Sequence, residues 1–223
     1  MNISPDLFSS AFIWFANIVV FAALVLSLFF IHWSALRQDT RIQHILGLCT
    51  VVLMVIWSIR AGISDGLGIH LFLITALHLL MGWQLAIWVA CFAITGTVLV
   101  GLESVEGFGV NMLVSVLIPL ISNYCVWLAH HKSNATHPFS FVFLVAFLGG
   151  ALSVFASGIA MTAIVLIEGI YSFEQVTNEF WIFIPLIAFP EAFINGMLIS
   201  ILIFNHPEWV RLFDQERYFA VKK

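Results

Sequence analysis

The stretch FSSAFIWFANIVVFAALVLSLFFI, from Phe8 to Ile31, contains no charged residue and no proline. A helix of about 20 residues, rising 1.5 Å per residue, crosses the roughly 30 Å hydrocarbon core of a bilayer. This stretch is longer than that, and no basic residue precedes it as the start of a cleaved signal peptide would require. It predicts a retained transmembrane helix near the amino terminus.

The composition of the whole chain agrees with this prediction. Of 223 residues, 62% are hydrophobic and only 9% are charged, which is too few charges to cover a water-soluble domain. The formal net charge of −4 gives no basic footprint for nucleic acid. Cys49, Cys91 and Cys125 each lie inside an apolar run without paired spacing, so we interpret them as small buried hydrophobic residues.

Six further apolar runs follow the first one, at approximately 43–59, 68–81, 83–101, 110–129, 139–171 and 180–204. They predict an all-α membrane bundle of about seven transmembrane helices in one domain, residues 1–204, followed by a cytoplasmic tail, residues 205–223. The third run is short for a span and follows Gly62, Gly66 and Gly68, which indicates an irregular glycine-rich segment. The sixth run is long enough to require tilt or an interfacial turn.

The basic residues predict the orientation of this bundle. If seven spans alternate, only Arg60 falls on the side of the amino terminus. The positive-inside rule then places the amino terminus outside and the carboxyl terminus in the cytoplasm. We expect a multi-pass protein of a bacterial-type plasma (inner) membrane. Acidic residues lean toward the outer face, where they either attract cations or are simply tolerated. The other seven basic residues share the inner side: Arg37, Arg41, Lys132, Arg211, Arg217, Lys222 and Lys223.

Four polar residues within the apolar runs are candidates for function, because such residues are costly in a membrane. His70 follows Asp65 in the glycine-rich segment, near the expected outer mouth, whereas His78 lies deeper. Eight helical residues separate the two imidazoles by about 12 Å, so they cannot share one ion. Asn111 and Glu191 could lock helices together or contribute to the shell of a ligand, and the residues favour neither role.

The remaining motifs are less informative. The other histidines lie near the cytoplasmic boundary, where such residues are usually anchors at the level of the lipid headgroups. Gly149, Ser153 and Ser157, at four-residue spacing, form a face for close helix packing, against either another span or another protein. No nucleophile elbow, phosphate loop or metalloprotease motif is present, so the sequence predicts no enzyme.

Four short stretches, taken in order, give the chain a family resemblance. They are MNISPDLF at the amino terminus, Gly68-Ile69-His70, Gly109-Val110-Asn111-Met112, and Pro190-Glu191-Ala192 with Gly196. The chain resembles the substrate-binding permease subunits of energy-coupling factor transporters for cobalt and nickel. Those subunits have an inserted amino-terminal segment of the type Met-His-Ile-Pro-Asp-Gly-Phe, a Gly-His motif, a Gly-x-Asn motif and a last span containing glutamate.

The resemblance implies a set of nitrogen ligands for a divalent transition-metal ion. Carried over to this chain, they are the Met1 amine, the backbone amide of Asn2 and the imidazole of His70. Asn2 stands where the family has histidine, and a side-chain amide is a weak oxygen donor, so we expect lower affinity or a changed ion. Asp65, His78, Asn111 and Glu191 are possible members of the surrounding shell. The ion is cargo, cobalt or nickel by resemblance, and no permanently bound cofactor is expected.

Three functions remain open from the sequence. The preferred one is a lipid-embedded binding subunit for metal uptake, energised by a separate transmembrane coupling subunit and an ATPase pair, as the resemblance implies. A second is a metal-free scaffold or assembly factor for another membrane complex, suggested by Asn2 and the small-residue face. A third is a solitary metal carrier that works without ATPase partners.

Overall fold

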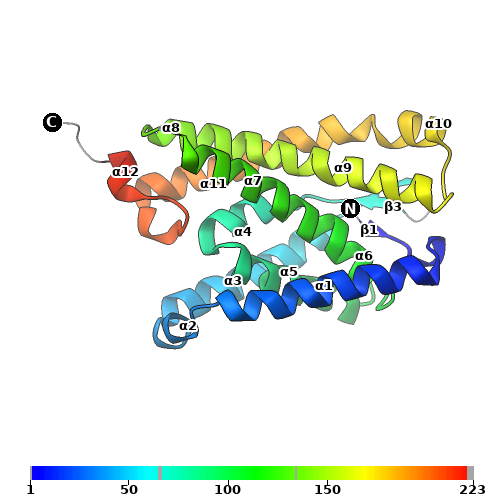
Figure 1. Cartoon of the computed structure of the whole chain (residues 1–223), viewed down its shortest axis with the longest axis horizontal. Coiled ribbons are helices and arrows are strands. Elements are labelled where there is room, and N and C mark those ends of the chain that lie inside the picture. The colour runs from blue at the N-terminus through cyan, green and yellow to red at the C-terminus, as the bar shows by residue number, and fades with distance from the viewer. Residues whose placement is uncertain (1, 65–66, 134, 220–223) are drawn as a thin grey trace.

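The computed structural model of the chain, which describes residues 2–64, 67–133 and 135–219, is an all-α membrane bundle with one small sheet (Figure 1). Within this described part, five continuous helices are long and apolar enough to cross a membrane, and a sixth apolar helix is shorter. The all-α prediction is confirmed, whereas seven crossings and their orientation stay predictions. The long helices are α1 (Ser10–Phe30), α3 (Thr40–Ser58), α5 (Trp83–Leu99), α7 (Ile118–Lys132), α9 (Gly149–Ile167) and α11 (Phe183–Asn205).

Short helical segments extend α7 and α9, and another precedes α11. The segment α6 (Phe108–Met112) and the π-helical η2 (Leu113–Leu117) run into α7, so that one continuous helix covers Phe108–Lys132. In the same way α8 (Pro138–Ser140) and the π-helical η3 (Phe141–Leu148) precede α9, which gives a 30-residue helix at the run predicted to be longest. The π-helical η4 (Val176–Phe180) precedes α11.

The remaining short elements gather at the two ends of the bundle (Figure 1). We call the end with the sheet and α10 (Phe173–Gln175) the sheet end, where η1 (Pro5–Leu7) also leads into α1. The opposite, tail end holds α2 (Trp33–Gln38), η5 (Pro207–Trp209) and α12 (Gln215–Phe219). Among the described basic residues only Arg60 follows a helix that ends at the sheet end.

The sheet has three antiparallel strands in the order β1-β3-β2. The central strand β3 (Leu67–Ile69) pairs with β1 (Asn2–Ile3) on one side and with β2 (Ala61–Ser64) on the other. A register shift between Gly62 and Ser64 bends β2 against its partner. The glycine-rich start predicted for the third run is therefore a β-hairpin, whose backbone groups are satisfied by strand pairing rather than by a helix.

The third run continues as the short helix α4 (Ile74–Met81), which is buried along almost its whole length. Its eight residues rise only about 12 Å, so α4 covers part of a membrane's thickness. Leu73, which caps its start, has a φ of 55°, in the left-handed region that costs a leucine about 1–2 kcal/mol. Gly82, with a φ of 81°, ends it and turns the chain into α5, which packs beside α4.

The small-residue face predicted on the sixth run packs inside the chain. Gly149, Ser153 and Ser157 are all buried, and the Ser157 hydroxyl donates to Val114 O at 2.7 Å. A Cβ on Gly150 would lie 3.3 Å from the Cα of Ala192 in α11. These small residues let α9 approach α7 and α11 closely, so the face is used within the bundle.

The segment after α11 folds back onto the tail end of the bundle. Val210, Phe213 and Tyr218 are buried in a second hydrophobic cluster with Phe141 and Leu79. The backbone N–H groups of the same segment bond to α4, Arg211 N to Leu80 O and Leu212 N to Leu79 O, both at 3.1 Å. The tail thus closes the carboxyl end of α4.

Candidate functional site

His70 lies between β3 and α4, where the sheet meets the helical bundle. Its side chain is buried, and the rings of Trp57 and Phe72 pack against it at centroid distances of 5.3 and 5.8 Å. Its Nδ1 lies 3.0 Å from Leu71 O. Because a carbonyl oxygen only accepts, this contact favours the tautomer with the proton on Nδ1.

The strand β1 brings the start of the chain to His70. Asn2 is paired with Gly68 and Ile3 with Leu67, so the Asn2 backbone lies in register with the residue two positions before His70. Of the other predicted site residues, Met1 and Asp65 lie outside the described residues. The pairing therefore supplies the geometry that an inserted amino-terminal segment requires, at the level of its backbone.

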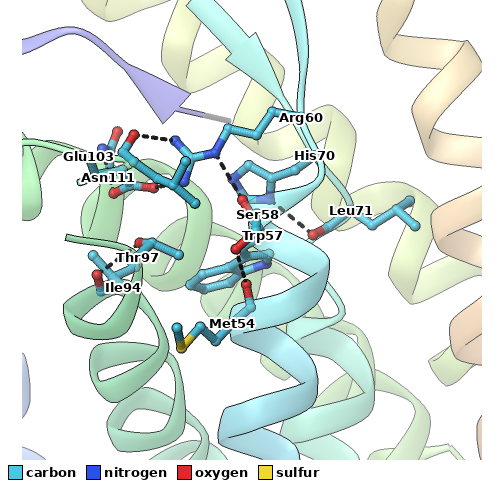
Figure 2. Close-up of polar contacts among 11 residues, drawn as sticks. Met54, Trp57, Ser58, Arg60, His70, Leu71, Ile94, Thr97, Glu103 and Asn111 are labelled. Atoms are coloured by element: carbon cyan, nitrogen blue, oxygen red, sulfur yellow. Dashed lines mark hydrogen bonds and ion pairs between the residues drawn. The ribbon is translucent and has the colours of Figure 1, made fainter. Parts of the chain in front are cut away.

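An ion pair lies beside His70 and holds Asn111 (Figure 2). The Arg60 guanidinium bonds to Glu103 at 2.8 Å, and Glu103 in turn accepts from the Asn111 side chain at 3.1 Å. Arg60 also donates to Trp57 O at 2.9 Å, in the turn that carries the indole against His70. We call Arg60, Glu103 and Asn111 the ion-pair group. It joins the ends of α3, α5 and α6 around His70.

Glu191 acts on the segment after His70 through the backbone. Its two carboxylate oxygens accept from Phe72 N at 2.8 Å and from Leu73 N at 2.7 Å. Asn195, one turn later on α11, donates to Glu191 at 2.9 Å and accepts from Ala76 N at 2.7 Å. A negative group at a helix start is favourable, because the N–H groups there have no partners within the helix. Glu191 and Asn195 thus cap α4 from another helix and fix residues 72–76.

His78 lies near the opposite end of α4 and does not meet the group around His70. Its Nδ1 contacts Asn123 Oδ1 at 2.7 Å, and the rings of Tyr124 and Trp127 lie 5.9 and 6.4 Å away. The structure therefore brings together His70, Asn111 and the backbone of Asn2 near the sheet end. Glu191 reaches the same region through the backbone of Phe72, and His78 stands apart.

Sequence reasoning missed four residues of this region: Trp57, Asn195, and the ion-paired Arg60 and Glu103. Two of them had a signal. Arg60 was the one basic residue that broke the charge segregation, and Asn195 follows Glu191 by four residues, which places both on one helix face. Trp57 had none, since an aromatic residue in an apolar helix usually faces lipid or the core.

The described part of the chain contains no group of three or more His, Cys, Asp or Glu residues that could hold a metal ion. A carboxylate or thiolate cage is therefore absent from that part. The arrangement near His70 instead places one imidazole next to the backbone of β1, which is paired with β3. This fits a site completed by main-chain nitrogen atoms. Such nitrogen donors suit borderline ions of the nickel and cobalt type.

Comparisons with known proteins agree on the fold. A solved structure described as a truncated transition metal transporter has a TM-score of 0.72 and 14% identity, covering 92% of this chain and 100% of that one. A second, described as a transition metal transporter, has a TM-score of 0.70 and 14% identity, covering 91% of this chain and 92% of that one. At such identities the likeness concerns the fold alone. No curated protein sequence matches the chain.

The sequence itself matches a family model over almost its full length. The model is that of the cobalt uptake substrate-specific transmembrane region, and the match covers residues 2–209. That range includes the sheet, α4, the residues Glu191 and Asn195 that cap its start, and the long helices. The chain therefore belongs to the cobalt uptake substrate-specific transmembrane region family.

Proposed function

We propose that this protein is the substrate-binding permease component of an uptake system for a divalent transition-metal ion. The observation that carries the proposal is the pairing of Asn2 with Gly68, which sets the start of the chain beside His70 in a member of a cobalt uptake family. In this proposal the ligands are the Met1 amine, the Asn2 amide and the imidazole of His70. The ion is cargo, cobalt or nickel, and the protein is not an enzyme.

The surroundings of His70 support a site that is held rigid before the ion arrives. Glu191 holds the backbone of Phe72 and Leu73, while the rings of Trp57 and Phe72 pack on the His70 imidazole. A ligand whose orientation is set in advance binds with less loss of entropy. The buried ion pair of Arg60 and Glu103 gives the same region a polar wall close to the expected outer face.

Energy for transport comes, in this proposal, from a separate coupling subunit and an ATPase pair in a bacterial-type plasma membrane. The chain has no phosphate-binding loop of its own. One argument for the alternative function, a metal-free scaffold, was the small-residue face on α9. That face is buried against α7 and α11, so this argument no longer supports the scaffold. Co-purification in mild detergent with a coupling subunit and ATPases would favour transport over both the scaffold and the solitary carrier.

The decisive experiment is calorimetric titration of Co²⁺ and Ni²⁺ into protein that carries an unmodified amino terminus. Changing a residue that only orients a metal ligand commonly costs 10–100-fold in affinity, and His70 is proposed as a ligand itself, so His70→Ala should lower affinity by on the order of 100-fold or more. Acetylation of the Met1 amine should have a similar effect. His44→Ala, which removes an exposed histidine in α3, is the matched control and should bind like the unchanged protein. Equal affinity in all these proteins would refute the proposed site.

A further inference from the structure

His78 is a buried histidine whose tautomer is set by the neighbouring side chain of Asn123. The Asn123 side chain donates its Nδ2 to Val145 O at 2.9 Å, so its Oδ1 faces His78. That oxygen lies 2.7 Å from His78 Nδ1 and can only accept. The proton of the neutral imidazole therefore sits on Nδ1, and Nε2 carries an electron pair.

This Nε2 is the one buried side-chain nitrogen or oxygen among the described residues that has no hydrogen-bond partner. His78 itself is 0% exposed. Buried polar atoms are almost always paired, and an orphan in a native fold asks for an explanation such as a bound ion. An imidazole whose other nitrogen donates to a fixed oxygen is the arrangement that proteins use to present a metal ligand.

A pocket of about 210 Å³ lies against His78 at the tail end, where α4 turns into α5. Its lining includes Tyr124 and Trp127 of α7, together with Gln84 and Arg211. The open side of Gly82 faces both of these polar groups: a Cβ there would lie 2.8 Å from Gln84 Oε1 and 3.6 Å from Arg211 Nη1. The lining of the pocket thus includes the imidazole with the unpaired nitrogen, an amide side chain and a phenol side chain.

We propose that His78 and this pocket form a second, weak binding site for the transported transition-metal ion, used as the ion leaves toward the tail end. The inference rests on the proposed function, since it takes the same cargo. His70 lies four residues before α4 begins and His78 lies in its last turn, so this one helix would link a first and a second binding site.

The weakness of the second site follows from its composition. It supplies one imidazole, and the Arg211 guanidinium, which also bonds Met81 O at 3.1 Å, repels a cation nearby. Passage through several sites requires that the ion be held weakly enough to leave each one. Access needs a movement of the wall, because Nε2 is shielded. Tyr124, which is 38% exposed, is the wall residue best placed to swing away.

The test is equilibrium dialysis of Co²⁺ against the full chain with an unmodified amino terminus, together with cobalt anomalous diffraction from crystals soaked at millimolar Co²⁺. We expect one tight site and one weaker site, with an anomalous peak at bonding distance from His78 Nε2. His78→Gln should remove the weak site and the peak. The control His44→Gln, at an exposed histidine, should retain both.

A second variant keeps the inference testable if His78→Gln fails to fold. Arg211→Gln removes the repelling charge and should tighten the weak site by about threefold to tenfold, which a purely structural role of Arg211 would not produce. A tight site that depends on His70, with no cobalt at His78 and no change in Arg211→Gln, would overturn this inference and leave the proposed function standing. If the unchanged protein binds cobalt at neither site, both this inference and the proposed function are overturned.

Discussion

Glu191→Gln should loosen the segment that carries His70 while leaving its shape almost unchanged. The remaining side-chain oxygen can still accept from Leu73 N and from Asn195, in the place of Oε1. The new amide nitrogen takes the place of Oε2 and faces the N–H of Phe72, which is then a buried donor without an acceptor. Removing a charged acceptor from a buried hydrogen bond costs about 1.5–3 kcal/mol.

We therefore expect Glu191→Gln to lower the free energy of unfolding by about 2 kcal/mol. For a chain of this size each kcal/mol shifts the melting temperature by about 2–4 °C, so the expected shift is about 4–8 °C. Because Phe72 is two residues from His70, cobalt affinity should fall by roughly 10-fold, the lower part of the range for residues that orient a ligand. Thermal unfolding in detergent and calorimetric titration measure the two effects.

The matched control is Glu174→Gln, which removes the same charge from an exposed residue of α10 at the sheet end. Such a surface change should stay within about 0.5 kcal/mol. If Glu191→Gln unfolds and binds cobalt like Glu174→Gln, then Glu191 does not fix the segment after His70, and the reasoning fails. A loss of stability without any loss of affinity would show that the cap serves the fold alone.

Three further substitutions test other parts of the structure. Asn2→His supplies the imidazole that the family pattern has at this position, so it should raise Ni²⁺ and Co²⁺ affinity at least about tenfold in titration; unchanged affinity would show that the side chain of residue 2 does not reach the ion. Gly109→Ala would place a Cβ 2.8 Å from the backbone N of Asn17, so α6 and α1 must separate at a cost of about 1–3 kcal/mol in thermal unfolding. Gly47→Ala, which meets nothing within 4 Å, is its control and should be neutral or slightly stabilising. Arg60→Met leaves Glu103 buried without its cation and should cost about 3–5 kcal/mol, measured in the same way; a cost below about 1 kcal/mol would refute the structural role of the ion pair.

The long helices could be predicted from the sequence because each one is a local property of the chain. An apolar run such as Phe8 to Ile31 carries its own length and its own boundaries, and the structure has α1 within it. The strands could not be predicted in this way. Asn2 and Ile3 make up the whole of β1, and only their pairing with Gly68 and Leu67 makes them a strand.

In the candidate site, too, some features could be predicted from the sequence and others could not. His70 was visible because a histidine is expensive in an apolar run, and Glu191 was visible for the same reason. What Glu191 does was not visible, since its partners are backbone N–H groups, which every residue except proline has. The pairing of Arg60 with Glu103 joins residues 43 positions apart, and no sequence spacing encodes such a contact.

The capping of α4 from α11 and the tail also constrains how the protein is made. An eight-residue helix is too short to be stable alone, and residues 191–212, which bond both of its ends, are synthesised more than a hundred residues later. Until the last helix and the tail are in place, the N–H groups of Phe72 and Leu73 lack the acceptors that α11 supplies, and the carbonyl groups of Leu79 and Leu80 lack the donors that the tail supplies. The centre of the bundle is thus completed last. A chain that stops before α11 would keep unpaired backbone groups at α4, which membrane proteases could recognise as a sign of an incomplete protein.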